Sequence, residues 1–297
     1  MTIGVSGRWQ PYPLFCLALF LPFAATGSTP LGPDTSTGAV VAAAVAYVAD
    51  YQRHLTSLLA DEIYTQDVIT QIPPDPGMPR ARRMSSEVFF MFAPGSHDWM
   101  AIRDVIAIDG RAITERPDIR TALQTLPATD AAATFKTYNS RFNLGRIYRN
   151  FNEPTLSLLV LDAKHRERFS FDRKRVEHAG DTVLVTLKFV EKESPTLIRD
   201  LKRGRVFSRG ELVVEASTGR VRRAVLEATT DVKLELTTTY SPDERLGMWV
   251  PRQFRERYER GVSPNSRTFD SRTEYEHIVC EARYTNYRRF ETTVRVK

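Results

Sequence analysis

The spacing of apolar residues along the chain changes from helical to alternating near residue 60. Between Thr37 and Leu59 apolar side chains recur at intervals of three and four, the pattern of an amphipathic helix with one apolar stripe. Thr37 is expected to cap this helix. From Asp61 onward, beginning with "DEIYTQDVIT", apolar and polar residues alternate as in a half-buried β-strand. Because a lone amphipathic helix is marginal in water, this one is predicted to pack on another element.

The next strand is apolar on both sides. Near the end of "RMSSEVFFMFAPG" the two alternating sets are Val88, Phe90 and Phe92 on one side and Phe89 and Met91 on the other. This pattern predicts a strand with one face in a core and the other face under a helix. The strand after it, "DWMAIRDVIAIDGR", is expected to turn at Asp109-Gly110, a pair that favours tight hairpin turns.

Helical patterns occupy the middle of the chain. In "TDAAATFKTYNSRF" Thr129 is expected to cap a helix, and a second helix is expected from Asn152, with Pro154 in its first turn. From about Arg166 the chain is strand after strand, separated by the turn signals "HAGD", "STGR", "SPDE" and "VSPN". Short connections between alternating strands predict an antiparallel meander.

The first residues have the order of a secretory signal. Arg8 precedes an apolar run from about Tyr12 to Ala25, and small residues follow. We expect a signal peptide over residues 1–27, a linker over 28–36 and one domain over 37–297, which places the mature protein in the periplasm or outside the cell. A retained anchor is less favoured, because a spanning helix needs about 20 apolar residues. Lipid attachment at Cys16 is also less favoured, because the apolar run continues after it.

The charge and composition of the chain limit the classes of binding partner that can be expected. The chain has 42 basic and 36 acidic residues, a net charge of +6, and ordinary globular proportions of 42% hydrophobic and 26% charged residues. Its arginines are scattered through strand-like segments instead of forming one basic tract, so no nucleic acid partner is predicted. The distribution is typical of a solvated, arginine-rich sheet face. Attraction to an anionic membrane surface is the alternative.

The residues that could carry chemistry do not converge. Ser96-His97-Asp98 has the letters of a hydrolase triad, but adjacent side chains point in different directions, so the segment is interpreted as a turn. His277 and Cys280 are three apart in a strand, which sends them to opposite faces and predicts a buried, inert thiol. If Cys16 leaves with the signal, Cys280 has no disulfide partner in its own chain. No catalytic residue, metal site or cofactor is predicted.

A family resemblance rests on one hairpin. The segment "ELVVEASTGRVRRAVLE" carries Glu215, Thr218-Gly219 and Arg222, in the order strand, acidic residue, Thr-Gly, strand with an arginine. It resembles the periplasmic lipoprotein-carrier superfamily, the LolA-like proteins with their LppX-like and RseB-like relatives. The segments "LGMWVPRQFRERYE" and "ARYTNYRRF" look like an uncharacterised exported bacterial family assigned to the same fold. Judged by its own residues alone, without the resemblance, the hairpin is interpreted as a structural part of the sheet with no catalytic or ligand-binding role.

The resemblance implies an α+β fold: a curved, incompletely closed antiparallel β-barrel, or half-barrel, with helices covering its concave face. The expected function is non-enzymatic binding or carriage of a lipid or acylated ligand in an apolar interior. The alternative is a protein-interaction or envelope-sensor module on the same fold, with an envelope protein as its partner and no bound lipid. The residues predicted to line the interior are Phe90, Phe92, Val183, Val185, Leu187, Leu234, Leu236 and Trp249.

Overall fold

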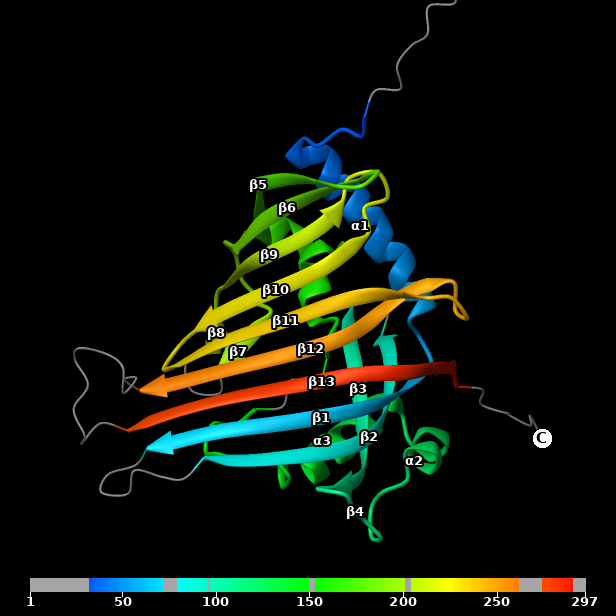
Figure 1. Cartoon of the computed structure of the whole chain (residues 1–297), viewed down its shortest axis with the longest axis vertical. Helices are drawn as coiled ribbons and strands as arrows, with labels where there is room; N and C mark the ends of the chain where they lie inside the picture. Colours follow the sequence, from blue (N-terminus) through cyan, green and yellow to red (C-terminus); the bar gives the residue numbers. More distant parts are fainter. Residues whose placement is uncertain are drawn as a thin grey trace, which may run out of the picture. The chain divides into compact units, whose positions relative to one another are not determined.

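The computed structural model describes residues 32–71, 79–93, 95, 97–149, 153–200, 204–261 and 274–290. Over these residues the chain runs through the following elements (Figure 1): α1 (Thr37–His54), β1 (Leu58–Gln71), β2 (Arg80–Ala93), β3 (Asp98–Ile108), β4 (Arg111–Ala112), α2 (Ile119–Thr125), α3 (Ala128–Ser140), the 3₁₀ helices η1 (Leu156–Leu161) and η2 (Arg166–Arg168), β5 (Phe169–Ala179), β6 (Thr182–Glu191), β7 (Ile198–Asp200), β8 (Gly204–Val206), β9 (Ser208–Glu215), β10 (Val221–Thr229), β11 (Val232–Asp243), β12 (Met248–Gly261) and β13 (Tyr275–Arg289).

Eleven of the described strands form one antiparallel sheet, in the order β4-β3-β2-β1-β13-β12-β11-β10-β9-β6-β5, and β7 pairs with β8. The last strand, β13, pairs with β1, so distant parts of the chain lie side by side in the middle of the sheet (Figure 1).

The sheet has two edge strands and does not close into a barrel. One end is the short β4, and the other is β5, whose central residues are charged and exposed, a common protection against edge-to-edge pairing. The predicted meander and the α+β class are confirmed; helices across a concave face stay a prediction.

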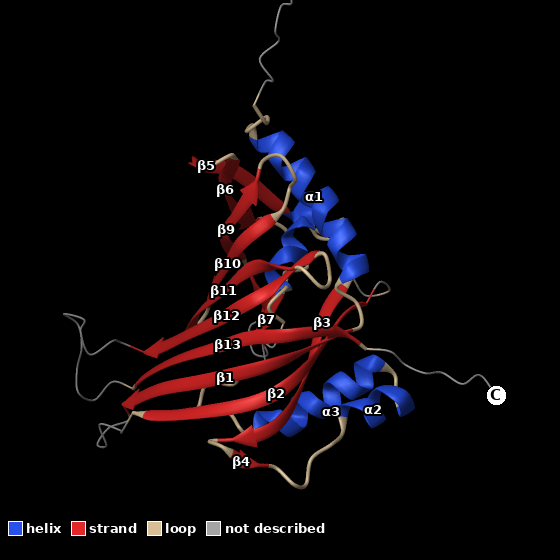
Figure 2. Cartoon of the chain, turned by 45° about the vertical axis from the view of Figure 1, so that its right-hand side comes forward, coloured by secondary structure: helices blue, strands red, loops and turns tan. Residues whose placement is uncertain are grey.

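The two faces of the sheet carry different cores. Val88, Phe90 and Phe92 of β2 belong to the larger core, and we call the sheet face that bears them the core face. The apolar side of α1 and the buried residues of η1 belong to the same core. On the opposite face, Phe89 packs with Ile119 and Phe135 of α2 and α3 in a second, smaller core, and Figure 2 shows these two helices beside β2 and β3. The two-sided burial predicted for β2 is therefore confirmed.

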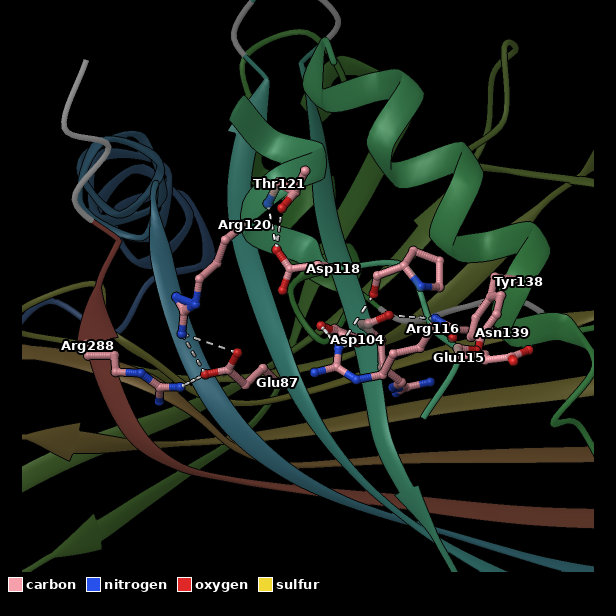
Figure 3. A network of polar contacts seen from close by, with 12 residues as sticks. Glu87, Asp104, Glu115, Arg116, Asp118, Arg120, Thr121, Tyr138, Asn139 and Arg288 are labelled. Carbon is pink, nitrogen blue, oxygen red and sulfur yellow. Dashed lines mark hydrogen bonds and ion pairs between the residues drawn. The ribbon is translucent and has the colours of Figure 1, made fainter. Parts of the chain in front are cut away.

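A polar network fastens α2 and α3 to β2 and β3 (Figure 3). Arg116 binds the buried carboxylate of Asp104 on β3, and Asp118 caps α2 by accepting the Thr121 N–H at 2.7 Å. Farther along, the carboxylate of Glu87 binds both Arg120 of α2 and Arg288 of β13. Because these charges meet an opposite charge or a backbone N–H, the network is best explained as structural.

Several predicted boundaries differ from the structure. Ser36, not Thr37, caps α1, because Ser36 is extended and its hydroxyl accepts the Ala39 N–H at 3.4 Å. Thr129 lies inside α3, which begins at Ala128 after Pro127. Pairing with Trp249 and Met248 carries β11 through Asp243, so its turn comes later than "SPDE", over residues 244–247.

The expected turn at Asp109-Gly110 is present, and both residues have positive φ, 48° and 79°, as this hairpin turn requires. Where a helix was expected from Asn152, the described chain has a turn at Pro154 followed by the short η1. Asn152 itself, Ser96, the signal peptide, residues 28–31 of the linker and the turn "VSPN" lie outside the described residues. Within the described part of the chain, no helix is long and apolar enough to cross a membrane.

Candidate functional site

The core face is apolar over β6, β9, β10 and β11. Its side chains there, among them Val185, Leu187 and Leu236, are fully buried and belong to the same core as α1 and η1. Contacts of α1 with β5 and β9, and of η1 with β10, bring the two helices onto this part of the sheet. We call this apolar part of the core, between the strands and the two helices, the apolar trough.

The residues predicted to line the interior are distributed over this core. Six of them are buried in it: Phe90, Phe92, Val185, Leu187, Leu234 and Leu236. Val183 and Trp249 are partly buried and pack against it. Whether they contact a ligand stays a prediction.

The other half of the core face, from β12 to β3, adds a buried polar cluster to its apolar side chains, and the sequence reasoning missed this cluster. We call this part of the face the polar half. The carboxylate of Glu62 on β1 accepts two hydrogen bonds from Arg103 on β3, at 2.6 and 2.8 Å, and both side chains are buried. Nearby, the hydroxyls of Tyr64 and Tyr258 both donate to the carboxylate of Glu256. A signal was available, because Glu62 and Tyr64 alternate in phase with buried apolar residues of the same strand.

The segment from Phe142 to Arg149 covers this polar half. Its backbone and side chains bind strand residues: Gln66 donates to the Phe142 carbonyl at 3.0 Å, and Glu276 accepts the N–H groups of Arg146 and Ile147 at 2.6 and 3.0 Å. The interior therefore contains hydrogen-bonded polar groups among its apolar side chains from β12 to β3.

Burial also changes the acidity of Glu256, the carboxyl group at the centre of this polar half. It raises the pKa of Glu256, although hydrogen bonds from Tyr258 and Tyr64 and the charges of Arg103 and Arg149 oppose the shift. The carboxyl group is thus held among donors and cations in an interior that disfavours its charge.

An open pocket lies at the end of the strands beside α1. It has a volume of about 530 Å³ and is lined by Ala179, Thr182, Leu184, Arg222, Tyr240, Ser241 and Trp249. Tyr240 belongs both to this pocket and to the core: its ring meets Tyr51 of α1 edge to face, with centroids 6.3 Å apart. Tyr240 is therefore shared by the lining of the pocket and the apolar core under α1. Of the predicted lining residues, Trp249 is the one that lines this pocket.

Two arginines stack on Trp249 and share one carboxylate. The guanidinium carbons of Arg222 and Arg220 lie 4.0 and 5.2 Å from the centre of the indole, and both groups bind Glu215. Burial raises the pKa of Glu215, but hydrogen bonds from Thr218 and Arg222 and the two positive charges outweigh it, so the pKa is lowered overall. We call Glu215, Arg220, Arg222 and Trp249 the Trp249 cluster.

The hairpin that suggested the family resemblance has two roles: its strands contribute residues to the core, and Glu215, Arg220 and Arg222 belong to the Trp249 cluster. Leu212, Val214 and Leu226 on its strands are buried in the core. Its turn packs on α1: Gly219 has a φ of +70°, and a Cβ atom placed there would lie 2.0 Å from the Ala43 carbonyl oxygen. Glycine therefore allows both the turn and the close approach of the helix.

Basic residues on the face opposite the core are largely paired with acids. Arg209 binds Glu227 across β9 and β10, and Lys233 binds Glu259 across β11 and β12. Cross-strand pairs of opposite charge stabilise a sheet modestly and leave little net charge on its surface. This arrangement supports the interpretation of a solvated sheet face.

The remaining chemical candidates stay apart. Cys280 is fully buried on the core face, while His277 points to the other side and is half-buried, as predicted from their spacing. His97 faces Asp162, 3.3 Å away, instead of its neighbour Asp98. Among the described residues, no group of three or more His, Cys, Asp or Glu side chains could hold a metal ion.

Cys280 is expected to react slowly with thiol reagents in the native protein. Burial raises the pKa of its thiol to about 12, so little of the reactive thiolate exists near neutral pH. Labelling with a chromogenic disulfide reagent, with and without denaturant, measures this. Rapid labelling without denaturant would show that the strand opens or that its phase is wrong.

Comparison with known proteins gives two solved structures of interest. A DUF1329 family protein from Desulfovibrio piger matches with a TM-score of 0.37 and 12% identity, covering 88% of this chain and 95% of that one. A putative outer membrane lipoprotein-sorting protein domain from Vibrio parahaemolyticus matches with a TM-score of 0.32 and 8% identity, covering 86% and 93%. No family model matches the chain, and no curated protein matches it.

Proposed function

We propose that the protein is an exported, non-enzymatic binding or carrier protein whose ligand is a lipid or an acylated molecule. The observation that carries this proposal is that Tyr240 lines the pocket at Trp249 and is also buried in the apolar core that includes the trough. A volume of about 530 Å³ lies in the ordinary range for small-molecule sites. An acyl chain that enters the trough would gain roughly 0.8 kcal/mol for each buried methylene group.

In this proposal α1 is the element that moves to admit the ligand. Its contacts with the core are apolar, through residues such as Val40, Ala44 and Val48. Among the described hydrogen bonds that the α1 side chains make to distant segments is that of Gln52 with Asp162, at 2.7 Å. An acyl chain could replace the apolar contacts that the core residues lose when the helix moves.

Two unpaired polar atoms under α1 support a ligand or water there. The hydroxyl of Tyr51 and the indole nitrogen of Trp99 are buried and have no hydrogen-bond partner among the described residues. Their rings are in contact, with centroids 5.9 Å apart. Buried polar groups are normally hydrogen-bonded, and an oxygen atom of a bound molecule would satisfy either one. The polar half of the core face would stop the acyl chain at its other end.

A second candidate is the interaction or sensor module. It is favoured by the complete burial of Val185, Leu187 and Leu236, because a trough already filled by side chains leaves a partner only the outer surfaces of α1 and the sheet. The two functions differ in whether an acyl chain reaches the trough.

Brominated fatty acids test the proposal, because bromine quenches only nearby tryptophans. The chain has three tryptophans, and Trp9 falls within the predicted signal peptide. In a Trp9→Phe background, Trp249→Phe leaves Trp99, which contacts Tyr51 of α1 in the core, as the reporter beneath the helix. Trp99→Phe leaves Trp249 as the reporter in the pocket. We expect micromolar acid, equivalent to roughly −8 kcal/mol, to quench both reporters.

Unbrominated acid of the same length is the control and should leave both emissions unquenched. Quenching of neither reporter, across several chain lengths, would remove the carrier function and leave the interaction module. Quenching of Trp249 alone would confine the ligand to the pocket and contradict entry under α1.

A further inference from the structure

We infer that the ligand of this protein is an anionic amphiphile, whose carboxylate or phosphate group binds Arg222 in the pocket at Trp249. This inference rests on the proposed function and adds the chemical class of the head group. The first observation is the charge of the Trp249 cluster: its two guanidinium groups share one carboxylate, so the cluster carries one net positive charge.

The arginine donors are incompletely used. The Nε atoms of both Arg220 and Arg222 are buried and have no hydrogen-bond partner among the described residues. Both side chains nevertheless keep about a third of their surface exposed, 33% in each case, so an incoming ligand can reach them. A guanidinium group presents several N–H donors in a fixed plane, which suits the two oxygens of a carboxylate or phosphate.

The backbone aims Arg222 at the pocket. The pairing of β10 with β9 shifts register between Val221 and Arg223, which places Arg222 at a β-bulge. Bulges commonly redirect a side chain, and here Arg222 stacks on Trp249 and lines the pocket. The stacking holds the guanidinium in place, which lowers the entropy lost when a ligand binds.

Apolar groups surround this cation. Leu184, Tyr240 and Trp249 line the same pocket as Arg222. An inorganic anion would gain nothing from these three side chains, whereas an amphiphile would place its charge on Arg222 and its first methylene groups against them. The combination therefore favours an acylated anion over a free one.

Arg222→Gln tests the assignment against a matched control. We expect it to weaken binding of myristate by about tenfold, the size of one charge-assisted hydrogen bond, and to leave binding of the uncharged methyl ester unchanged. Isothermal titration calorimetry measures both, with dodecyl phosphate as a second anionic amphiphile and inorganic phosphate as the free anion. Arg223→Gln, which changes an exposed arginine next in the strand, should alter neither affinity.

Glu215→Gln separates head-group binding from a structural role. It removes the carboxylate that competes for the arginines, so myristate should bind more tightly, with a steeper loss of affinity as salt is added. If Arg222 only supported the fold, both Arg222→Gln and Glu215→Gln would weaken binding. Thermal unfolding of each variant verifies that it is folded.

The outcomes distinguish the two levels of the proposal. Equal binding of myristate and its ester, with no effect of Arg222→Gln, would overturn the head-group assignment while leaving the carrier function intact. Binding of inorganic phosphate as tightly as dodecyl phosphate would show a free-anion site and overturn it as well. Failure of acid, ester and dodecyl phosphate to bind the unmodified protein would overturn both.

Discussion

Val185→Asp is expected to destabilise the fold by about 4 kcal/mol or more, a large part of the roughly 5–15 kcal/mol by which native domains are stable. Val185 is fully buried in the middle of β6, among the apolar side chains of the core. An aspartate there would be buried among apolar side chains. Folding would then require either burying an unpaired charge or protonating the carboxylate, and both cost free energy. Circular dichroism and urea unfolding measure the loss.

The control is Val190→Asp on the same strand. Val190 is exposed and lies in the opposite phase, so its replacement should change the free energy of unfolding by less than about 1 kcal/mol. A folded Val185→Asp protein with only moderate loss of stability would mean that water reaches this position. That result, combined with weaker binding of an acyl probe, would show an open cavity where the structure has a filled trough.

Arg103→Met is expected to cost about 3–5 kcal/mol, the range for breaking a buried ion pair by removing one partner. The cost arises because the Glu62 carboxylate, whose side chain is 0% exposed, would lose both hydrogen bonds from the guanidinium. Methionine is close in length to the aliphatic part of arginine, so the lost charge, more than lost packing, would dominate. Urea unfolding of the variant and the unmodified protein gives the difference.

Two further variants isolate the charge. The double variant Glu62→Leu with Arg103→Met should recover most of the stability, because an apolar pair of similar volume often replaces a buried ion pair without loss. Arg209→Met removes an exposed pair with Glu227 and should cost less than about 1 kcal/mol. A double variant as unstable as Arg103→Met alone would show that packing, not the unpaired carboxylate, sets the cost.

The periodicity of apolar residues in the sequence determined many of the individual helices and strands. The apolar stripe of α1, the two-sided β2 and the meander from β5 to β12 follow from which positions are apolar, because a helix repeats its faces every 3.6 residues and a strand every two. The buried position of Cys280 followed from the same counting. Caps and turn boundaries were less accurate, since they depend on single hydrogen bonds such as that of Ser36 with Ala39.

Only the tertiary structure decided which residues meet. Glu62 and Arg103 are 41 residues apart, and Tyr64 and Glu256 are 192 apart, so no local pattern could pair them. Alternation places Glu62 and Tyr64 on one face of β1, but only the folded sheet brings Glu256 of β12 onto that face and buries all three in an internal polar network. The same holds for Trp249 and Arg222, which lie on different strands and become one site because a bulge and the strand order of the sheet bring a guanidinium over an indole.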